Sequence, residues 1–129
     1  MSGIYAHQAR GVRALDPETA VVDFDWQPFG RWLKYRMPLI LVGYAAPELA
    51  CPFNEKARRA AAALDNLIAT KPLQVFVSED ELVPCRYYAS ISLEGLDGKP
   101  VDLVEELIRR GHGLAWERGK PRPDFEALP

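Results

Sequence analysis

Apolar and polar residues alternate along the first half of the chain with the period of a β-strand. In residues 20–26 every second side chain is apolar, and two of the three residues between them are aspartates, which predicts a strand with one buried face. Residues 4–15 have weaker strand character, and residues 32–44 form a longer apolar segment that predicts a third strand. Pro38 lies inside this third segment and has no N–H to donate, so we expect a sheet edge or a bulge there.

The second half of the chain combines helical spacing with further strands. Apolar residues in 54–69 recur on one helix face, and the segments 73–77 and 87–93 have strand patterns. Residues 103–110 are predicted to form a short helix, because Asp102 has a glutamate three residues later, which is the spacing of a capping box.

The resulting order of elements is β-β-β-α-β-β-α. Five strands with a helix between the third and the fourth is the arrangement of an OB-fold, a small and partly open barrel. We therefore predict an α+β, mainly β fold: a five-stranded OB-fold barrel with this helix between strands 3 and 4 and a short C-terminal helix. A split α+β sheet is the alternative and fits the order less well. The whole chain, 1–129, is predicted to be a single domain in which the proline-rich residues 116–129 form an extended tail.

Composition narrows the classes of function. The net charge of the 129-residue chain is −2, which argues against nucleic-acid binding through bulk charge. No apolar segment reaches the ~20 residues needed to cross a bilayer. The N-terminus lacks the apolar core of a signal peptide, so we expect a cytoplasmic protein. The two cysteines, Cys51 and Cys85, are too few for a disulfide scaffold and are expected to be free thiols.

Four short segments, in the same order and at similar spacing, resemble the staphylococcal nuclease (thermonuclease) family of OB-folds. The segments are LDPET at 15–19, LILVGYAAPE at 39–48, RYYA at 86–89 and residues 101–115. They are similar, in turn, to the family's Asp-Gly-Asp-Thr turn, its third strand with the Asp-x-Pro-Glu loop, its Tyr-Gly-Arg-x-Leu-Ala strand start, and its Val-Asn-x-x-Leu-Val-x-x-Gly-x-Ala segment. The resemblance extends over residues 11–118, which is most of the chain.

The resemblance implies a site of five groups. Two aspartates would hold calcium, a glutamate would activate water, and two arginines would grip the phosphate. The metal positions fall on Glu18 and Ala45, the general base on Glu48, and the arginines on Ile40 and Arg86. Glu48 and Arg86 match the family's residues. Glu18 keeps the carboxylate of the family's aspartate on a side chain that is one methylene longer, whereas Ile40 and Ala45 carry no charge. The resemblance thus supports the fold more than the activity, and it leaves Glu18 as the one candidate metal ligand.

The retained residues also fit structural roles. Glu48 fits a structural position in its loop, and Arg86 fits either phosphate binding or an ion pair with Glu48 or Glu18. The candidate nucleic-acid-binding residues are Arg86, Tyr87, Tyr88, Arg58 and Arg59. Aromatic side chains on OB-fold strands can stack on bases but more often belong to a core, and the arginines of residues 54–69 equally fit a solvated helix face.

No cofactor is expected, since the two histidines, His7 and His112, have no cysteine or carboxylate partners at zinc-ligand spacing. We therefore predict a noncatalytic nuclease-like protein that acts as a binding or assembly module for a protein partner or a second copy. Arginine outnumbers lysine by 11 to 5, as in high-GC genomes, and a phage-borne structural or accessory protein of the virion is one form of this prediction. The alternatives are a calcium-dependent endonuclease or phosphodiesterase with a rearranged site, and a single-stranded nucleic-acid-binding protein.

Overall fold

Five strands of the computed structural model, which describes residues 4–24, 36–48, 54–126 and 128, close into a mixed barrel. The barrel strands are β1 (Ile4–Asp16), β2 (Thr19–Phe24), β3 (Arg36–Leu41), β5 (Pro72–Glu79) and β6 (Tyr87–Glu94). β1, β2 and β3 form an antiparallel meander, and β5 pairs with both β1 and β6. A parallel pairing of β3 with β6, in which Ile40 is opposite Tyr88, closes the barrel.

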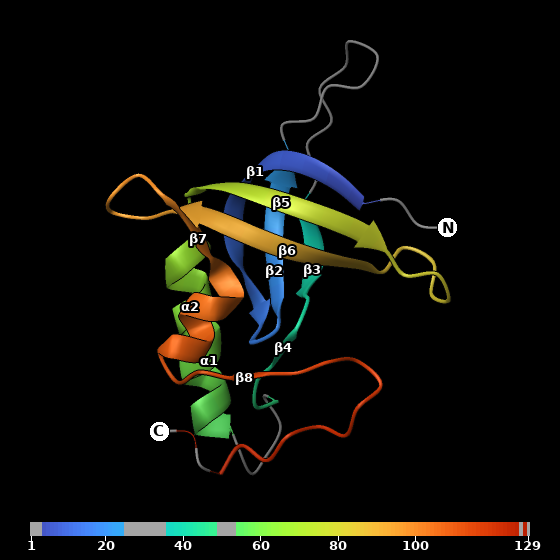
Figure 1. Cartoon of the computed structure of the whole chain (residues 1–129), viewed down its shortest axis with the longest axis vertical. Helices are drawn as coiled ribbons and strands as arrows, with labels where there is room; N and C mark the ends of the chain where they lie inside the picture. The colour runs from blue at the N-terminus through green and yellow to red at the C-terminus, as the bar shows by residue number, and fades with distance from the viewer. Residues whose placement is uncertain (1–3, 25–35, 49–53, 127, 129) are drawn as a thin grey trace.

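The remaining elements cover one end of this barrel (Figure 1). They are β4 (Tyr44–Ala45), α1 (Asn54–Ile68), α2 (Leu103–Arg109) and β8 (Leu114–Ala115), whereas β7 (Pro100–Asp102) pairs with β6 as a sixth strand of the sheet. Along the chain, α1 lies between the barrel strands β3 and β5, and α2 follows β7. In space, α2 packs beside α1. The predicted OB-like barrel with its two helices is therefore confirmed. Among the described residues no helix is long and apolar enough to span a membrane.

The long strand β1 pairs with two neighbouring strands and changes register along its length. Its first half pairs with β5 and its second half with β2, and the register shifts between Gly11 and Arg13 and again between Ala14 and Asp16. Such shifts bend a strand and free a backbone N–H from the ladder. The N–H of Ala14 donates instead to the carboxylate of Asp65 on α1, at 2.9 Å.

The barrel interior and the inner faces of both helices form one apolar core. The predicted stripe on α1 is confirmed, since Ala57, Ala60, Leu64, Leu67 and Ile68 are all buried. The largest fully buried side chains come from β3, β6, both helices and the segment after β3: Leu39, Leu41, Tyr44, Leu64, Ile68, Ile91, Leu103 and Leu107. The core therefore fixes the helices against the barrel end at which the cleft described below opens.

Helix α2 has the predicted N-terminal cap and ends at a glycine. The carboxylate of Asp102 accepts a hydrogen bond from the N–H of Glu105 at 3.0 Å. At the other end Gly111 has a φ of 81°, and the N–H groups of Gly111 and His112 donate to the carbonyls of Ile108 and Leu107. This is the Schellman arrangement, in which glycine avoids the cost of a left-handed backbone.

Several predicted boundaries differ from the observed ones. The third strand ends at Leu41 rather than at residue 44, because a turn at Val42 and Gly43 redirects the chain into β4. Pro38 lies opposite Val21 of β2, in a part of β3 that has no described partner on its other side, so the predicted edge is confirmed. Residues 116–126 are not simply extended, because they make turns at 118–119 and at 126.

Candidate functional site

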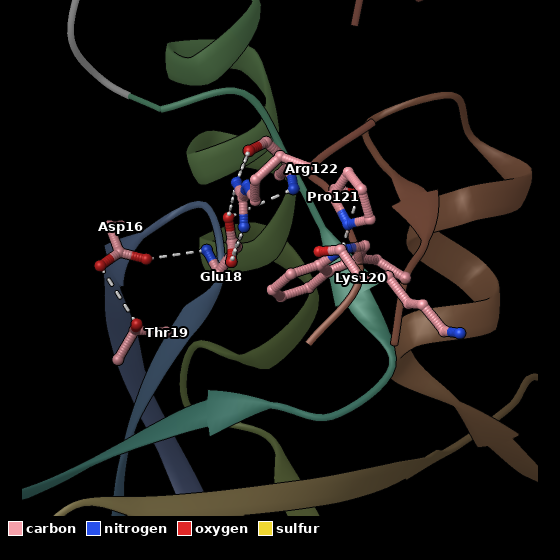
Figure 2. A network of polar contacts seen from close by, with 8 residues as sticks. Asp16, Glu18, Thr19, Lys120, Pro121 and Arg122 are labelled. Carbon is pink, nitrogen blue, oxygen red and sulfur yellow. Dashed lines mark hydrogen bonds and ion pairs between the residues drawn. The ribbon is translucent and has the colours of Figure 1, made fainter. Parts of the chain in front are cut away.

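The turn between β1 and β2 forms one wall of a cleft. One carboxylate oxygen of Asp16 accepts the N–H of Glu18 at 2.8 Å, and the other accepts the hydroxyl of Thr19 at 3.1 Å (Figure 2). Aspartate before a proline favours this local turn, because its side chain replaces a main-chain acceptor. The carboxylate of Asp16 is thus occupied in shaping the turn, which sets the position of Glu18.

The carboxylate of Glu18 is occupied by groups from two distant segments. Its two oxygens accept the two terminal nitrogens of the Arg122 guanidinium at 2.7 and 3.2 Å, as Figure 2 shows. The N–H of Ala46 adds a third bond at 3.3 Å, and Arg122 also donates to the carbonyl of Ala46 at 3.1 Å. The Glu18 side chain is only 18 % exposed, and its carboxylate raises the pKa of Arg122. A two-pronged arginine–carboxylate pair of this kind is strong and directional.

The cleft itself is a cavity of about 340 Å³. It is lined by Asp16, Pro17, Glu18, Thr19, Ile40, Pro47, Glu48, Arg118 and Arg122. Three positions singled out from the sequence, Glu18, Ile40 and Glu48, therefore meet here. Ala45 lies beside the cleft in β4 but is fully buried, and it pairs with Leu114 of β8.

Arg86 is held away from this cleft by the loop between β5 and β6. Its Nε and one terminal nitrogen donate to Asp80 at 2.9 and 2.7 Å, and the hydroxyl of Tyr88 donates to the same oxygen at 2.7 Å. The hydrogen bond from Tyr88 is the main reason that the pKa of Asp80 lies far below its usual value, with further bonds from Leu82, Arg86 and Val83. Of the two roles considered for Arg86, the ion pair with Glu48 or Glu18 is wrong, because Asp80, only six residues away, forms the pair instead.

Two arginines from the C-terminal segment, Arg118 and Arg122, line the cleft, whereas Arg86 does not. The guanidinium of Arg118 lies 4.4 Å from the ring centre of Tyr88 and 5.6 Å from that of Trp116. Arg122 lies 4.9 Å from the Trp116 ring, and Arg86 lies 5.8 Å from the Tyr88 ring. The Trp116 indole N–H donates to the carbonyls of residues 120 and 121, which ties the segment into a loop (Figure 2). Arginines and aromatic rings thus alternate along one row.

The other predicted binding residues lie elsewhere. Tyr87 packs its ring against the core, and burial is the first reason that its pKa is raised. Arg58 and Arg59 are exposed on α1, and neither lines the cleft. Cys85 is an exposed free thiol, as predicted. It does not line the cleft either. Trp26, Trp32, Tyr35 and Cys51 fall outside the described residues, as do the side chains of residues 4–7.

The described residues contain no group of three histidine, cysteine or carboxylate side chains arranged to hold a metal ion. Tyr44 is 1 % exposed, and its hydroxyl has no hydrogen-bond partner in the part of the chain that the structure describes. Burial, followed by the nearby charge of Glu18, raises its pKa well above the usual value. The cleft can therefore offer Glu48 and Arg118 to a ligand, but it offers no preformed metal site.

Sequence reasoning missed Arg118, Arg122 and Asp80 as members of these networks. Arg122 stands between two prolines, in a segment that the sequence indicated to be extended and locally basic but did not connect with Glu18. Its pairing with Glu18, 104 residues earlier, depends on how the tail returns across the barrel end. Neither protein-family models nor curated proteins give a match to this chain.

Proposed function

We propose that this protein is a noncatalytic, nuclease-like OB barrel that works as a binding or assembly module. The observation that carries the proposal is the ion pair between Glu18 and Arg122 in the cleft. In the resemblance Glu18 is the surviving metal position, and here its oxygens are satisfied by a guanidinium and a main-chain N–H. A calcium ion needs six to eight oxygen ligands and would have to displace Arg122 to reach this one.

The neighbouring positions support the same proposal. Ile40 lines the cleft where an arginine would bind phosphate, and Ala45 lies in the core where a carboxylate would bind metal. Losing one such charge-stabilising group typically costs ~3–4 kcal/mol of transition-state stabilisation. Reverting Ala45 to aspartate would bury a charge inside the β4–β8 pair, so the arrangement is not one substitution away from a catalytic site.

The hydrogen-bonded loop between β5 and β6 supports a role in assembly. The carboxylate of Asp80 accepts the N–H groups of Leu82 and Val83 at 2.7 and 3.0 Å, in addition to its bonds from Arg86 and Tyr88. The loop is thereby ordered, and yet Leu82 is 90 % exposed at its tip. An apolar side chain presented on an ordered loop is suited to fill a pocket on another protein surface, including that of a second copy.

The experiment is a size measurement by sedimentation, with and without single-stranded DNA. We expect concentration-dependent association beyond the 14.5 kDa monomer, unchanged by DNA and weakened by Leu82→Asp. Leu96→Asp is the matched control, because Leu96 is at least as exposed as Leu82 but sits in the turn between β6 and β7. Equal effects of the two substitutions, or a monomer at every concentration, would contradict the proposal.

Single-stranded nucleic-acid binding is the second candidate, and the row of arginines and aromatic rings favours it. Tyr88 and Trp116 are half-exposed, and Arg118 stacks between them with no carboxylate in ion-pair contact among the described residues. A base could stack on this row only where an arginine leaves a ring face open. DNA binding that falls steeply with salt and is lost in Arg118→Gln would favour this candidate.

A further inference from the structure

Another cavity lies on the outer face of the sheet, where β1, β5, β6 and β7 run side by side (Figure 1). Its volume is about 500 Å³, which falls within the ~300–1,000 Å³ of sites that hold small molecules. None of the residues that line this cavity lines the cleft. The polar side chains that line it are Gln8, Arg10, Gln74, Ser92 and Glu94.

Strand register arranges the side chains of this cavity in two neighbouring rows across the sheet. One row is Gln8, Gln74 and Ser92, and the next is Arg10, Pro72 and Glu94. Alternate residues of a strand point to opposite faces. Ala9 and Leu73, which lie between the two rows, are buried on the inner face. Both rows are therefore presented together on the outer face of the sheet.

Two opposite charges face this cavity from either side of β5. Of the described residues that line it, Arg10 on β1 and Glu94 on β6 carry a charge, and both are exposed. Two strand spacings of ~4.8 Å separate their backbones by ~10 Å. Within the described part of the chain, neither side chain makes an ion pair or a hydrogen bond. A cation and an anion are thus both open to a ligand.

The groups beside these two charges leave them available. Asp23 of β2 is opposite Arg10, but it is also opposite Arg36 of β3, and it does not line the cavity. At the other side, a Cβ added to Gly98 would lie 3.8 Å from a carboxylate oxygen of Glu94. The carboxylate therefore lies at the wall of the cavity that the turn between β6 and β7 forms.

We propose that this cavity binds a di- or tripeptide with free termini, its carboxylate on Arg10 and its ammonium on Glu94. One arginine can bind a carboxylate through two parallel hydrogen bonds. The side-chain amides of Gln8 and Gln74 each offer donors and an acceptor, which matches the peptide groups between the two ends. An extended residue spans at most ~3.3–3.6 Å, so two or three residues reach ~7–11 Å, close to the separation of the two charged residues. A ligand with charge of one sign would be repelled by one of them.

The test follows the backbone amide signals of the full chain by NMR during titration with trialanine, near neutral pH and at low ionic strength. We expect saturable shifts confined to the two rows and the turn that holds Gly98. Trialanine amide and N-acetyl-trialanine, which each lack one charge, should bind about tenfold more weakly, because each loses a hydrogen bond between charged groups. Arg10→Gln and Glu94→Gln should each weaken the binding of trialanine by a similar factor.

The blocked peptides also show which residue meets which end. Arg10→Gln should bind trialanine and trialanine amide equally, and Glu94→Gln should bind trialanine and N-acetyl-trialanine equally. Arg13→Gln and Glu79→Gln are the matched controls, because both residues are exposed on β1 and β5 but do not line the cavity. We expect both controls to bind trialanine within about twofold of the unmodified protein, since solvent and salt screen charges outside the cavity.

Four results would overturn the proposal. They are the absence of saturable shifts, equal affinity of the unmodified protein for trialanine and its blocked forms, equal losses in the control variants, and binding of uncharged maltotriose as tight as that of trialanine. The last result would show that the amides recognise a neutral ligand without help from the two charges.

Discussion

The two oxygens of Glu18 and the two terminal nitrogens of Arg122 face one another across 104 residues of sequence. The pair is partly shielded, with the glutamate less exposed than the arginine. Shielding and two parallel bonds place it at the upper end of the ~0–1 kcal/mol that surface ion pairs contribute. A single tail residue thereby fixes both the charge state of the cleft and the path of the C-terminal segment.

A double-mutant cycle measures this pair. Glu18→Gln, Arg122→Gln and their combination should give a coupling energy of about 1 kcal/mol in urea unfolding, because each single change leaves the partner without its counter-charge. Pairing Glu18→Gln with Arg118→Gln is the control. Arg118 contacts aromatic rings rather than Glu18, so these two changes should be additive. Additivity of Glu18 with Arg122 would show that the ion pair contributes nothing to stability.

The lowered pKa of His112 makes stability depend on pH in one direction. Because the folded state binds this proton less readily than the unfolded state, the unfolded state holds more protons in this range. The free energy of unfolding should therefore fall as pH drops from ~7 to ~5, through the ordinary histidine range. His112→Gln should remove that part of the slope. An unchanged slope in the variant would assign the pH dependence to other groups.

The crossing of β1 over the end of α1 holds the helix against the barrel. Gly11 donates its N–H to the carbonyl of Lys71 at 3.0 Å and accepts the N–H of Thr70 at 2.9 Å. A side chain at this position would overlap the carbonyl oxygen and Cβ of Ile68. The strand and the helix end therefore approach as closely as their backbones allow.

Gly11→Ala should destabilise the protein by about 3 kcal/mol, because the backbone of α1 or β1 must move to admit the methyl group. Gly119→Ala is the control, since Gly119 has a φ of 91° with no atom within 4 Å of an added Cβ. It should cost only the ~1–2 kcal/mol of a left-handed backbone. Urea unfolding measures both. Equal costs for the two substitutions would mean that the β1–α1 contact is not the constraint we describe.

At the scale of the whole molecule, the order of the five barrel strands and the two helices could be predicted because each has a local signal, whereas the short strands β4, β7 and β8 were not predicted. The period of two in residues 87–93 and the capping spacing at Asp102 depend only on neighbouring residues, and both correspond to observed elements. The resemblance to the staphylococcal nuclease family assigned Glu18, Ile40 and Glu48 to one site, and these three residues line the cleft.

The arrangement of the charges around the cleft could not be predicted in the same way. The sequence offered Glu48 and Glu18 as ion-pair partners of Arg86, but Asp80, which is closer in sequence, forms the pair. The segment that carries Arg122 is also held by the buried side chain of Phe125 and by Lys56, which donates to the carbonyls of Phe125 and Glu126. Such contacts join segments about 70 to 100 residues apart and leave no periodic pattern in the sequence.

Digestion of single-stranded DNA and RNA in the presence of calcium, magnesium or manganese tests the central claim most directly. We predict no metal-dependent cleavage by the unmodified protein, because Glu18 is paired with Arg122 while Ile40 and Ala45 supply neither charge nor ligand. Arg122→Gln, which frees the Glu18 carboxylate, should be equally inactive. Metal-dependent cleavage by the unmodified protein that disappears in Glu48→Gln or Arg86→Ala would contradict the noncatalytic account and establish a nuclease with a rearranged site.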